Sequence, residues 1–209
     1  MVLNKRLNIR EVLAEMGTQK LVLFTPSTFA KSLNTNISKA TIFLSRNTRL
    51  GYFVRLKKGI YSPANLRPSS LEIANIIYKP SYISLEIALS FYHIIPETVY
   101  SITSITTRVP KKTKVFNQIF TYQKLNRNLY FGYEVIRIGN RNVIMATKEK
   151  ALLDYLYFVA LGHKKYNERF DLRTLDKQKI SKYSKFFFRS IKNRYVKRRF
   201  ALLLRSINL

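Results

Sequence analysis

The sequence contains no cysteine, which excludes disulfide bonds, thiolate zinc sites and cysteine nucleophiles. Histidine is almost as scarce, since only His93 and His163 are present. Neither histidine has a neighbouring serine or carboxylate pattern typical of a catalytic triad. We interpret His93 as a structural or capping residue after an apolar helix, and His163, which follows Gly162, as marking a helix end. Metal binding and histidine-based catalysis are therefore disfavoured.

Glycine is also scarce, and six glycines in 209 residues leave little material for phosphate-cradling loops. The sequence has no Walker loop, no Rossmann glycine pattern and no paired-carboxylate motif. We therefore predict that the protein is not an enzyme and binds no cofactor or metal. A nuclease or nucleotidyltransferase is a weaker alternative, because the acidic residues are too scattered along the chain to supply a metal site.

Long apolar runs are missing, and no segment approaches the roughly 20 apolar residues that a membrane-spanning helix needs. The first ten residues, MVLNKRLNIR, contain no apolar run long enough for a signal peptide. At 46% hydrophobic residues, the chain can still build an ordinary core. We therefore expect a folded cytoplasmic protein without a membrane partner.

Acidic residues are few, because 11 Asp and Glu stand against 38 Lys and Arg, for a net charge of +27. Acids are absent from Thr18 to Leu71 and after Asp176, two segments with nine and eleven basic residues respectively. An A+T-rich genome would enrich glutamate as readily as lysine, so the depletion of acids is the informative feature. It predicts a polyanionic partner such as nucleic acid, although a ribosomal or membrane-surface protein would show the same excess.

The front of the chain changes from helical patterns to strand patterns. Residues 8–17 and 25–33 carry apolar residues at helical spacing, and a polar turn at 34–36 precedes a third helix that opens at Ser38. Further on, YFVRL alternates as a strand, KKG turns the chain and IYSP returns. Two helices, a tight turn, a third helix and a hairpin predict a winged helix-turn-helix domain over residues 1–66.

In such a domain the third helix enters the major groove of DNA, and the wing lies along the phosphate backbone. Arg46 is the best base-contacting candidate, because a guanidinium can hydrogen-bond guanine O6 and N7 together. Tyr52 and Tyr61 are interpreted as hairpin packing residues rather than base-stacking residues. The alternative is a helix face and a turn that are merely solvated. The candidate DNA-binding residues are Ser38, Lys39, Thr41, Ser45, Arg46 and Arg49 in the helix, and Arg55, Lys57 and Lys58 in the wing.

Residues 67–209 predict an α+β domain with C-terminal helices. Helices are expected at about 69–77 and at 84–93. Segments with alternating apolar residues then predict strands in sequence order and an antiparallel sheet, with Gly139-Asn140 as a hairpin turn. Helical spacing returns in TKEKALLDYLYFVAL and in the basic tail. The predicted strands are 99–107, 114–125, 129–138 and 142–147.

Two features of the C-terminal helices have more than one interpretation. The clustered cations of the tail form either a second nucleic-acid surface or the solvated face of a terminal helix. Lys150 and Asp154 lie four residues apart and are interpreted as an ordinary intrahelical ion pair. The clustered cations are Arg194, Lys197, Arg198 and Arg199.

Three segments carry a resemblance to a known family: RLKKGIYSP (55–63), KPSYISLEIALSFYHIIPE (79–97) and VIMATKEKALLDYL (143–156). Their order and spacing resemble the AbiEi antitoxins of abortive-infection, type IV toxin-antitoxin systems. The likeness extends over about two thirds of the chain, and Lys148 stands where the family pattern has proline.

The resemblance implies a winged helix that represses its own operon by binding promoter repeats in double-stranded DNA. It also implies a C-terminal domain that counters a cognate nucleotidyltransferase-like toxin, with which it need not form a stable complex. From the residues alone, an RNA-binding or ribosome-associated protein is the alternative, because the basic tail and the many aromatic residues would suit stacking on unpaired bases.

Overall fold

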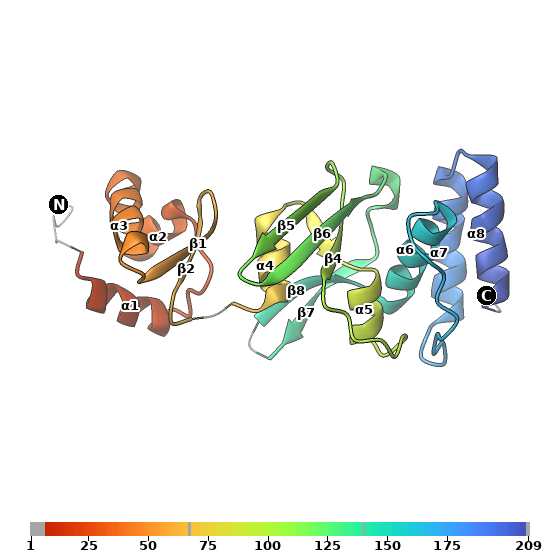
Figure 1. Ribbon diagram of the computed structural model, residues 1–209, viewed down its shortest axis with the longest axis horizontal. Coiled ribbons are helices and arrows are strands. Elements are labelled where there is room, and N and C mark those ends of the chain that lie inside the picture. The colour runs from red at the N-terminus through yellow and green to blue at the C-terminus, as the bar shows by residue number, and fades with distance from the viewer. Residues whose placement is uncertain (1–6, 67, 140, 208–209) are drawn as a thin grey trace. The chain divides into compact units, whose positions relative to one another are not determined.

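The computed structural model describes residues 7–66, 68–139 and 141–207. The chain divides into two compact units, Met1–Ser69 and Ser70–Leu209 (Figure 1). The domain boundary predicted between residues 66 and 67 falls beside Arg67, which lies outside the described residues. Over the described residues, every helix is too short or too polar to cross a membrane.

In its described part, the N-terminal unit places three helices before a two-stranded antiparallel hairpin. Each helix begins at a capping side chain, because Asn8, Thr25 and Asn36 accept hydrogen bonds from backbone N–H groups of the first turn. These caps satisfy donors that have no partner inside the helix. The elements are α1 (Ile9–Thr18), α2 (Pro26–Ser32), α3 (Ile37–Arg49), β1 (Phe53–Lys57) and β2 (Ile60–Pro63).

An aromatic core holds this unit together. Phe29 is fully buried, and its ring centroid lies 5.5 Å from that of Phe24 and 6.1 Å from that of Phe53. Phe24 also exchanges two backbone hydrogen bonds, of 3.1 and 2.9 Å, with Tyr61 of β2. Leu44 of α3 belongs to the same buried cluster. The third helix and the hairpin therefore share one core, which fixes their relative position.

The C-terminal unit is α+β, with helices before, between and after its strands. The helices are α4 (Ser70–Ile77), α5 (Glu86–Phe91), the 3-10 helix η1 (Arg127–Leu129), α6 (Lys148–Ala160), α7 (Lys177–Ser190) and α8 (Arg194–Ser206). The strands are β3 (Ser81–Ile83), β4 (Ile102–Thr106), β5 (Lys111–Val115), β6 (Gln118–Lys124), β7 (Tyr133–Ile138) and β8 (Arg141–Ala146).

The strands form a single sheet over the described residues, in the order β5-β6-β4-β3-β8-β7. The pairs β5-β6, β3-β4 and β7-β8 are antiparallel. The sequence predicts the β7-β8 hairpin, but it does not predict β3, and the single strand predicted at 114–125 is divided between β5 and β6. The predicted sequence order of the strands is wrong, since β4 pairs with β6 and β3 with β8, both in parallel. Parallel neighbours need a crossover connection, which local alternation does not reveal. Asn140, predicted as part of the last turn, lies outside the described residues.

The last three helices pack on one another at one end of this unit (Figure 1). The Tyr157 ring of α6 lies 5.8 Å from the Phe187 ring of α7 and 6.4 Å from the Phe200 ring of α8. Nearly every residue of α6 is buried, so this helix is the centre of the unit's helical layer. The outer helices α7 and α8 keep one face for α6 and leave the other to solvent.

Both histidines lie just beyond helices and are exposed. His93 follows α5, and its N–H donates to the Ser90 carbonyl at 3.0 Å. His163 follows Gly162, which ends α6 with a φ of +78°. The helix end predicted at His163 is therefore present. Over the described residues, no group of three or more histidine and acidic side chains is placed to hold a metal ion.

Candidate nucleic-acid interface

The outer face of α3 is the first candidate surface. Ala40 and Leu44 are fully buried and Asn47 nearly so, and this spacing turns one stripe of the helix into the core. The opposite stripe is left to solvent. All six residues predicted in this helix are exposed: Ser38, Lys39, Thr41, Ser45, Arg46 and Arg49.

The start of α3 is polar and carries no acid. The Asn36 side chain accepts a hydrogen bond of 2.8 Å from the Lys39 N–H and so caps the helix. The first turn contains no Asp or Glu, and the last turn carries Arg46 and Arg49. The positive end of the helix dipole therefore adds to the charge of Lys39 instead of being neutralised. Both ends of the exposed stripe favour an anion.

A short connection fixes the hairpin against α3. The Asn47 side chain donates to the Phe43 carbonyl at 2.8 Å, and the Tyr52 N–H donates to the Asn47 carbonyl at 2.9 Å. Gly51, between helix and strand, has a φ of +82°, which a residue with a Cβ adopts only with strain. These contacts make the junction a tight turn, so the position of the hairpin follows that of the helix.

The hairpin presents its cations to solvent. Arg55, Lys57 and Lys58 are all exposed, as the interpretation of a wing requires. The Arg55 guanidinium lies 6.0 Å from the ring centroid of Tyr61, which is 6% exposed and packs into the core. The turn is shorter than predicted, because Lys57 still belongs to β1 and pairs with Ile60, while Gly59 adopts a φ of +78°. The packing role predicted for Tyr61 is present, whereas Tyr52 is 43% exposed.

Sequence reasoning missed the apolar part of this surface. Ile37, Ile42 and Leu50 are 57%, 69% and 61% exposed respectively, although all three are large and apolar. Ile42 lies four residues after Ser38 and four before Arg46, on the outer stripe. This spacing could have been used to predict that Ile42 lies on the exposed stripe. An apolar side chain in this position can contact the methyl group of thymine.

The second predicted basic surface lies on α8, in the other unit. Arg194, Lys197 and Arg198 are exposed, while Arg199 is half-buried with its guanidinium 5.6 Å from the Tyr195 ring centroid. The helix is therefore both packed and charged. Its inner residues hold it on the domain, and its outer residues form the basic surface.

The interior of the C-terminal unit holds an ion pair that the sequence did not predict as buried. The side chains of Lys150 and Asp154 pair within α6 and have no exposed surface. Asp154 Oδ2 accepts hydrogen bonds of 2.9 Å from the hydroxyls of Tyr82 and Ser84. Burial lowers the pKa of the Lys150 ammonium and raises the pKa of the Asp154 carboxyl, because both charged forms lose water.

Gly132 closes one side of this ion pair. A Cβ added there would lie 3.1 Å from Lys150 Cγ and 3.1 Å from Tyr183 Cε2, and the residue has a φ of +70°. The ammonium also faces the Phe187 ring, whose centroid is 5.1 Å away. Gly132, Phe187, Tyr82 and Ser84 therefore all pack against the pair. It is a structural centre of the unit and not part of either basic surface.

No protein-family model matches this chain, and a search of curated proteins finds no relative. The functional proposal therefore depends on the residues and their geometry.

Proposed function

We propose that this protein is a sequence-specific DNA-binding regulator whose N-terminal unit is a winged helix-turn-helix domain. The observation that best supports this proposal is that all nine predicted contact residues are exposed on α3 and on the hairpin next to it. One packed unit thus offers a helix for the major groove and a charged hairpin for the backbone. The backbone pairing of Phe24 with Tyr61 supports this interpretation, because it ties the segment before α2 to the hairpin.

The charge of this unit supports double-stranded DNA as the partner. Its acidic residues, Glu11 and Glu15, both lie on α1, so α2, α3 and the hairpin carry only positive charge. Phosphate contacts supply affinity without sequence information, and base contacts supply specificity. The hairpin cations suit the first role, and Arg46 with Ile42 suits the second.

The resemblance to AbiEi antitoxins supports the biological role. We place the protein in the cytoplasm, where it would repress its own operon through promoter repeats and counter a nucleotidyltransferase-like toxin. In this proposal it acts by binding and not as an enzyme, and no stable complex with the toxin is required. Co-expression with the product of the neighbouring gene tests this part: rescue of growth supports it, and unrelieved toxicity counts against it.

Footprinting of the full-length protein on DNA upstream of its own gene tests the DNA-binding proposal. Protection of repeated sequences at physiological salt is the expected result. Arg46→Ala should relax the preference at one base pair by about 1–3 kcal/mol, and Arg46→Lys should relax it nearly as much, because lysine keeps the charge but loses the bidentate fork. Equal losses on every sequence would show that Arg46 does not read a base.

A further inference from the structure

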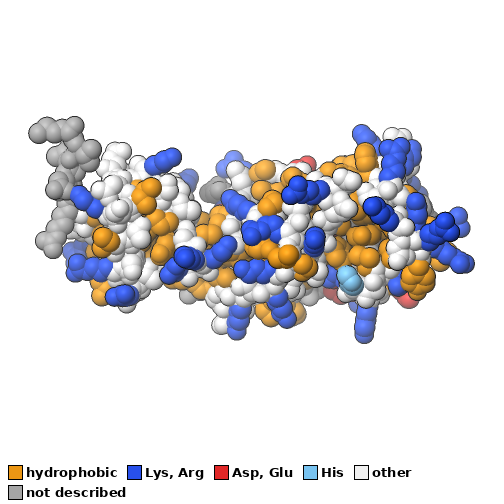
Figure 2. Space-filling view, turned by 90° about the horizontal axis from the view of Figure 1, so that it is seen from above, with side chains coloured by type: hydrophobic (Ala, Val, Ile, Leu, Met, Phe, Trp, Pro, Cys, Tyr) orange, Lys and Arg blue, Asp and Glu red, His pale blue; other side chains and the backbone are white. Residues whose placement is uncertain are grey.

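The two outer helices of the C-terminal unit carry a positive charge that, over the described residues, is neutralised at one position. The sequence after Asp176 contains eleven Lys and Arg and no acid. In the described part of this segment, Lys179 alone has a carboxylate partner, Glu149 of α6 at 3.1 Å. Figure 2 shows Lys and Arg side chains gathered over this end of the unit. A surface with this excess of cations favours a polyanion.

The inner apolar faces of α7 and α8 are packed, although Phe186, Tyr195 and Leu202 on these helices are 40%, 68% and 53% exposed. Phe187 and Phe200 are fully buried, and their rings stack with centroids 5.4 Å apart. Val196 and Ile180 are buried on the same inner sides. Insertion into a lipid surface would need these faces to be free. The buried inner faces are therefore not available to a lipid surface, and the cations point outward from a packed support.

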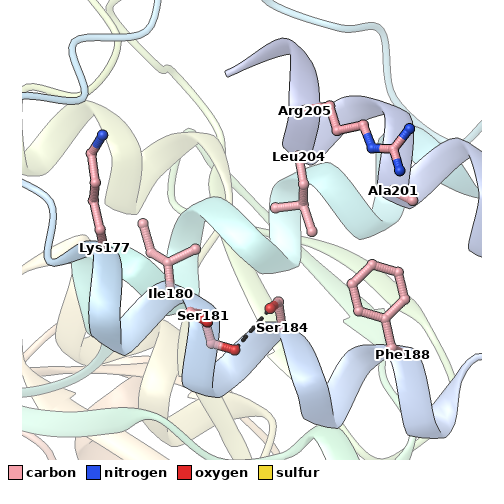
Figure 3. Close-up of a pocket in the computed structure, with 8 residues that line it drawn as sticks. All are labelled: Lys177, Ile180, Ser181, Ser184, Phe188, Ala201, Leu204 and Arg205. Atoms are coloured by element: carbon pink, nitrogen blue, oxygen red, sulfur yellow. Dashed lines mark hydrogen bonds between the residues drawn. The ribbon is translucent and has the colours of Figure 1, made fainter. Parts of the chain in front are cut away.

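A groove of about 450 Å³ lies between the two helices, and apolar side chains line it together with Ser181 and Ser184. Figure 3 shows Ile180 and Phe188 pointing from α7 toward α8, with Leu204 pointing back between them. Ala201 leaves room above this floor because its side chain is a single methyl group. Lys177 and Arg205 line the same groove. The apolar floor could contact the face of a nucleobase, and the cations beside it could contact the flanking phosphates.

A row of arginines on α8 extends from Arg205, which lines the groove. Arg194, Arg198 and Arg205 are exposed and share one helix face with Ala201, at spacings of four, three and four residues. At 1.5 Å per residue, the row is about 16 Å long. It is long enough to contact several phosphates of one strand.

We propose that α7 and α8 form a second nucleic-acid surface that binds single-stranded segments, with one unpaired base in the groove and the phosphates on the flanking cations. In a duplex the bases are stacked inside, so the groove would have no occupant. An acidic polypeptide is the less favoured partner, because protein interfaces have a broad apolar core with few lysines, whereas three large apolar side chains form this floor and Lys177 and Arg205 flank it. The proposal goes beyond promoter binding and uses none of the residues of the N-terminal unit.

Fluorescence anisotropy with the full-length protein tests the proposal, using labelled oligo-dT, oligo-U and a duplex of equal length over a range of salt concentrations. Single-strand binding that excess duplex does not displace is expected, because the duplex occupies the N-terminal unit, and the two single strands separate a DNA preference from an RNA preference. The double variant Arg198→Ala, Arg205→Ala should reduce the single-strand salt slope by about 1.4 units, at roughly 0.7 per lost phosphate contact. Both side chains are exposed, so the fold should survive.

Two further variants separate this site from a general effect of charge. Ala201→Leu fills the groove without changing the charge, and it should weaken single-strand binding about tenfold while leaving the duplex unaffected. Lys112→Ala, Lys114→Ala removes two exposed cations from β5 of the same unit and should change neither slope nor affinity. An equal loss in both double variants, no effect of Ala201→Leu, or displacement of the strand by poly-glutamate at equal charge would each overturn the proposal.

Discussion

The Tyr82 hydroxyl donates a hydrogen bond of 2.9 Å to Asp154 Oδ2 across 72 residues of sequence. The same hydroxyl accepts from the Lys150 ammonium at 2.9 Å, so it touches both members of the buried ion pair. Removing two charges from water is costly unless the remaining donors and acceptors are satisfied. Tyr82 and Ser84 supply those partners and thereby connect β3 and its following loop to α6.

Breaking this pair should destabilise the protein strongly. Lys150→Met leaves a buried carboxylate without its counter-charge, and the free energy of unfolding should fall by about 3–5 kcal/mol. Urea denaturation followed by circular dichroism measures the loss. Lys182→Met, the same substitution at an exposed position of α7, is the matched control and should change stability by less than about 0.5 kcal/mol. A similar loss in both variants would mean that the buried charge is not the cause.

The β1-β2 hairpin, which we propose to be a wing, allows a prediction about the salt dependence of DNA binding. Lys57→Ala, Lys58→Ala should flatten the slope of log affinity against log salt for duplex DNA by about two units, at roughly 0.9 per phosphate contact. Sequence preference should be retained, because phosphate contacts carry no base information. Arg10→Ala, Lys20→Ala removes the same charge from exposed positions elsewhere in the unit and should leave the slope unchanged. Equal flattening in both variants would exclude a specific wing contact.

The cap of α3 allows stability and DNA binding to be separated. Asn36→Ala removes the acceptor for the Lys39 N–H and should cost about 1 kcal/mol of unfolding free energy. Asn36→Asp keeps the cap and its stability, but its negative charge should weaken duplex binding several-fold by repelling phosphate. Asn36→Ser is the neutral control that keeps both. Thermal unfolding and anisotropy on the same samples give the comparison, and unchanged binding by the Asp variant would place the helix start away from DNA.

Alkaline pH should destabilise the C-terminal unit through its tyrosines. Burial raises the pKa of Tyr92 and of Tyr155 to about 12, and their hydroxyls donate to the carbonyls of Ala146 and Lys165 at 2.9 and 2.7 Å. The unfolded chain ionises its tyrosines near pH 10, before the folded chain does, so the free energy of unfolding should fall as pH rises from about 10 to 12.

Urea titrations at a series of alkaline pH values measure this fall, and tyrosinate absorbance can be followed cleanly because the chain has no tryptophan. The variant Tyr92→Phe, Tyr155→Phe should show a shallower dependence on pH. An unchanged dependence would assign the effect to the other tyrosines whose pKa burial raises, among them Tyr122 and Tyr130.

Features that depend on residues close together in the sequence, such as the exposed face of a helix, could be predicted. The outer stripe of α3 follows from the helical spacing of its inward-facing residues, so the exposure of the candidate residues could be predicted. The predicted start at Ser38 is one residue late, because Asn36 caps the helix and Ile37 begins it. The same helical spacing also places Ile42 on the outer stripe, but an apolar residue is usually assigned to the core, so its exposure was not predicted. Pattern reasoning assigns apolar residues to the core, although large apolar residues also occur on protein surfaces.

Long-range pairing could not be predicted. The strand β3 is three residues long, too short for alternation to show, yet it pairs with both β4 and β8 at the centre of the sheet. The spacing of Lys150 and Asp154 is the same for an exposed pair and a buried one. The buried pair differs from an exposed one in its contacts with Tyr82 and Ser84, which lie about seventy residues earlier in the chain.

Because Gly132 lies so close to Lys150, we expect substitutions at these two positions to be correlated in evolution. A side chain at residue 132 would press on the methylene groups that carry the buried ammonium, and its left-handed backbone adds a further penalty for most residues. Lineages that keep the lysine should therefore keep the glycine. A shorter residue at 150 would open space, and asparagine, which tolerates this backbone best among the larger residues, should then be the first replacement to appear at 132.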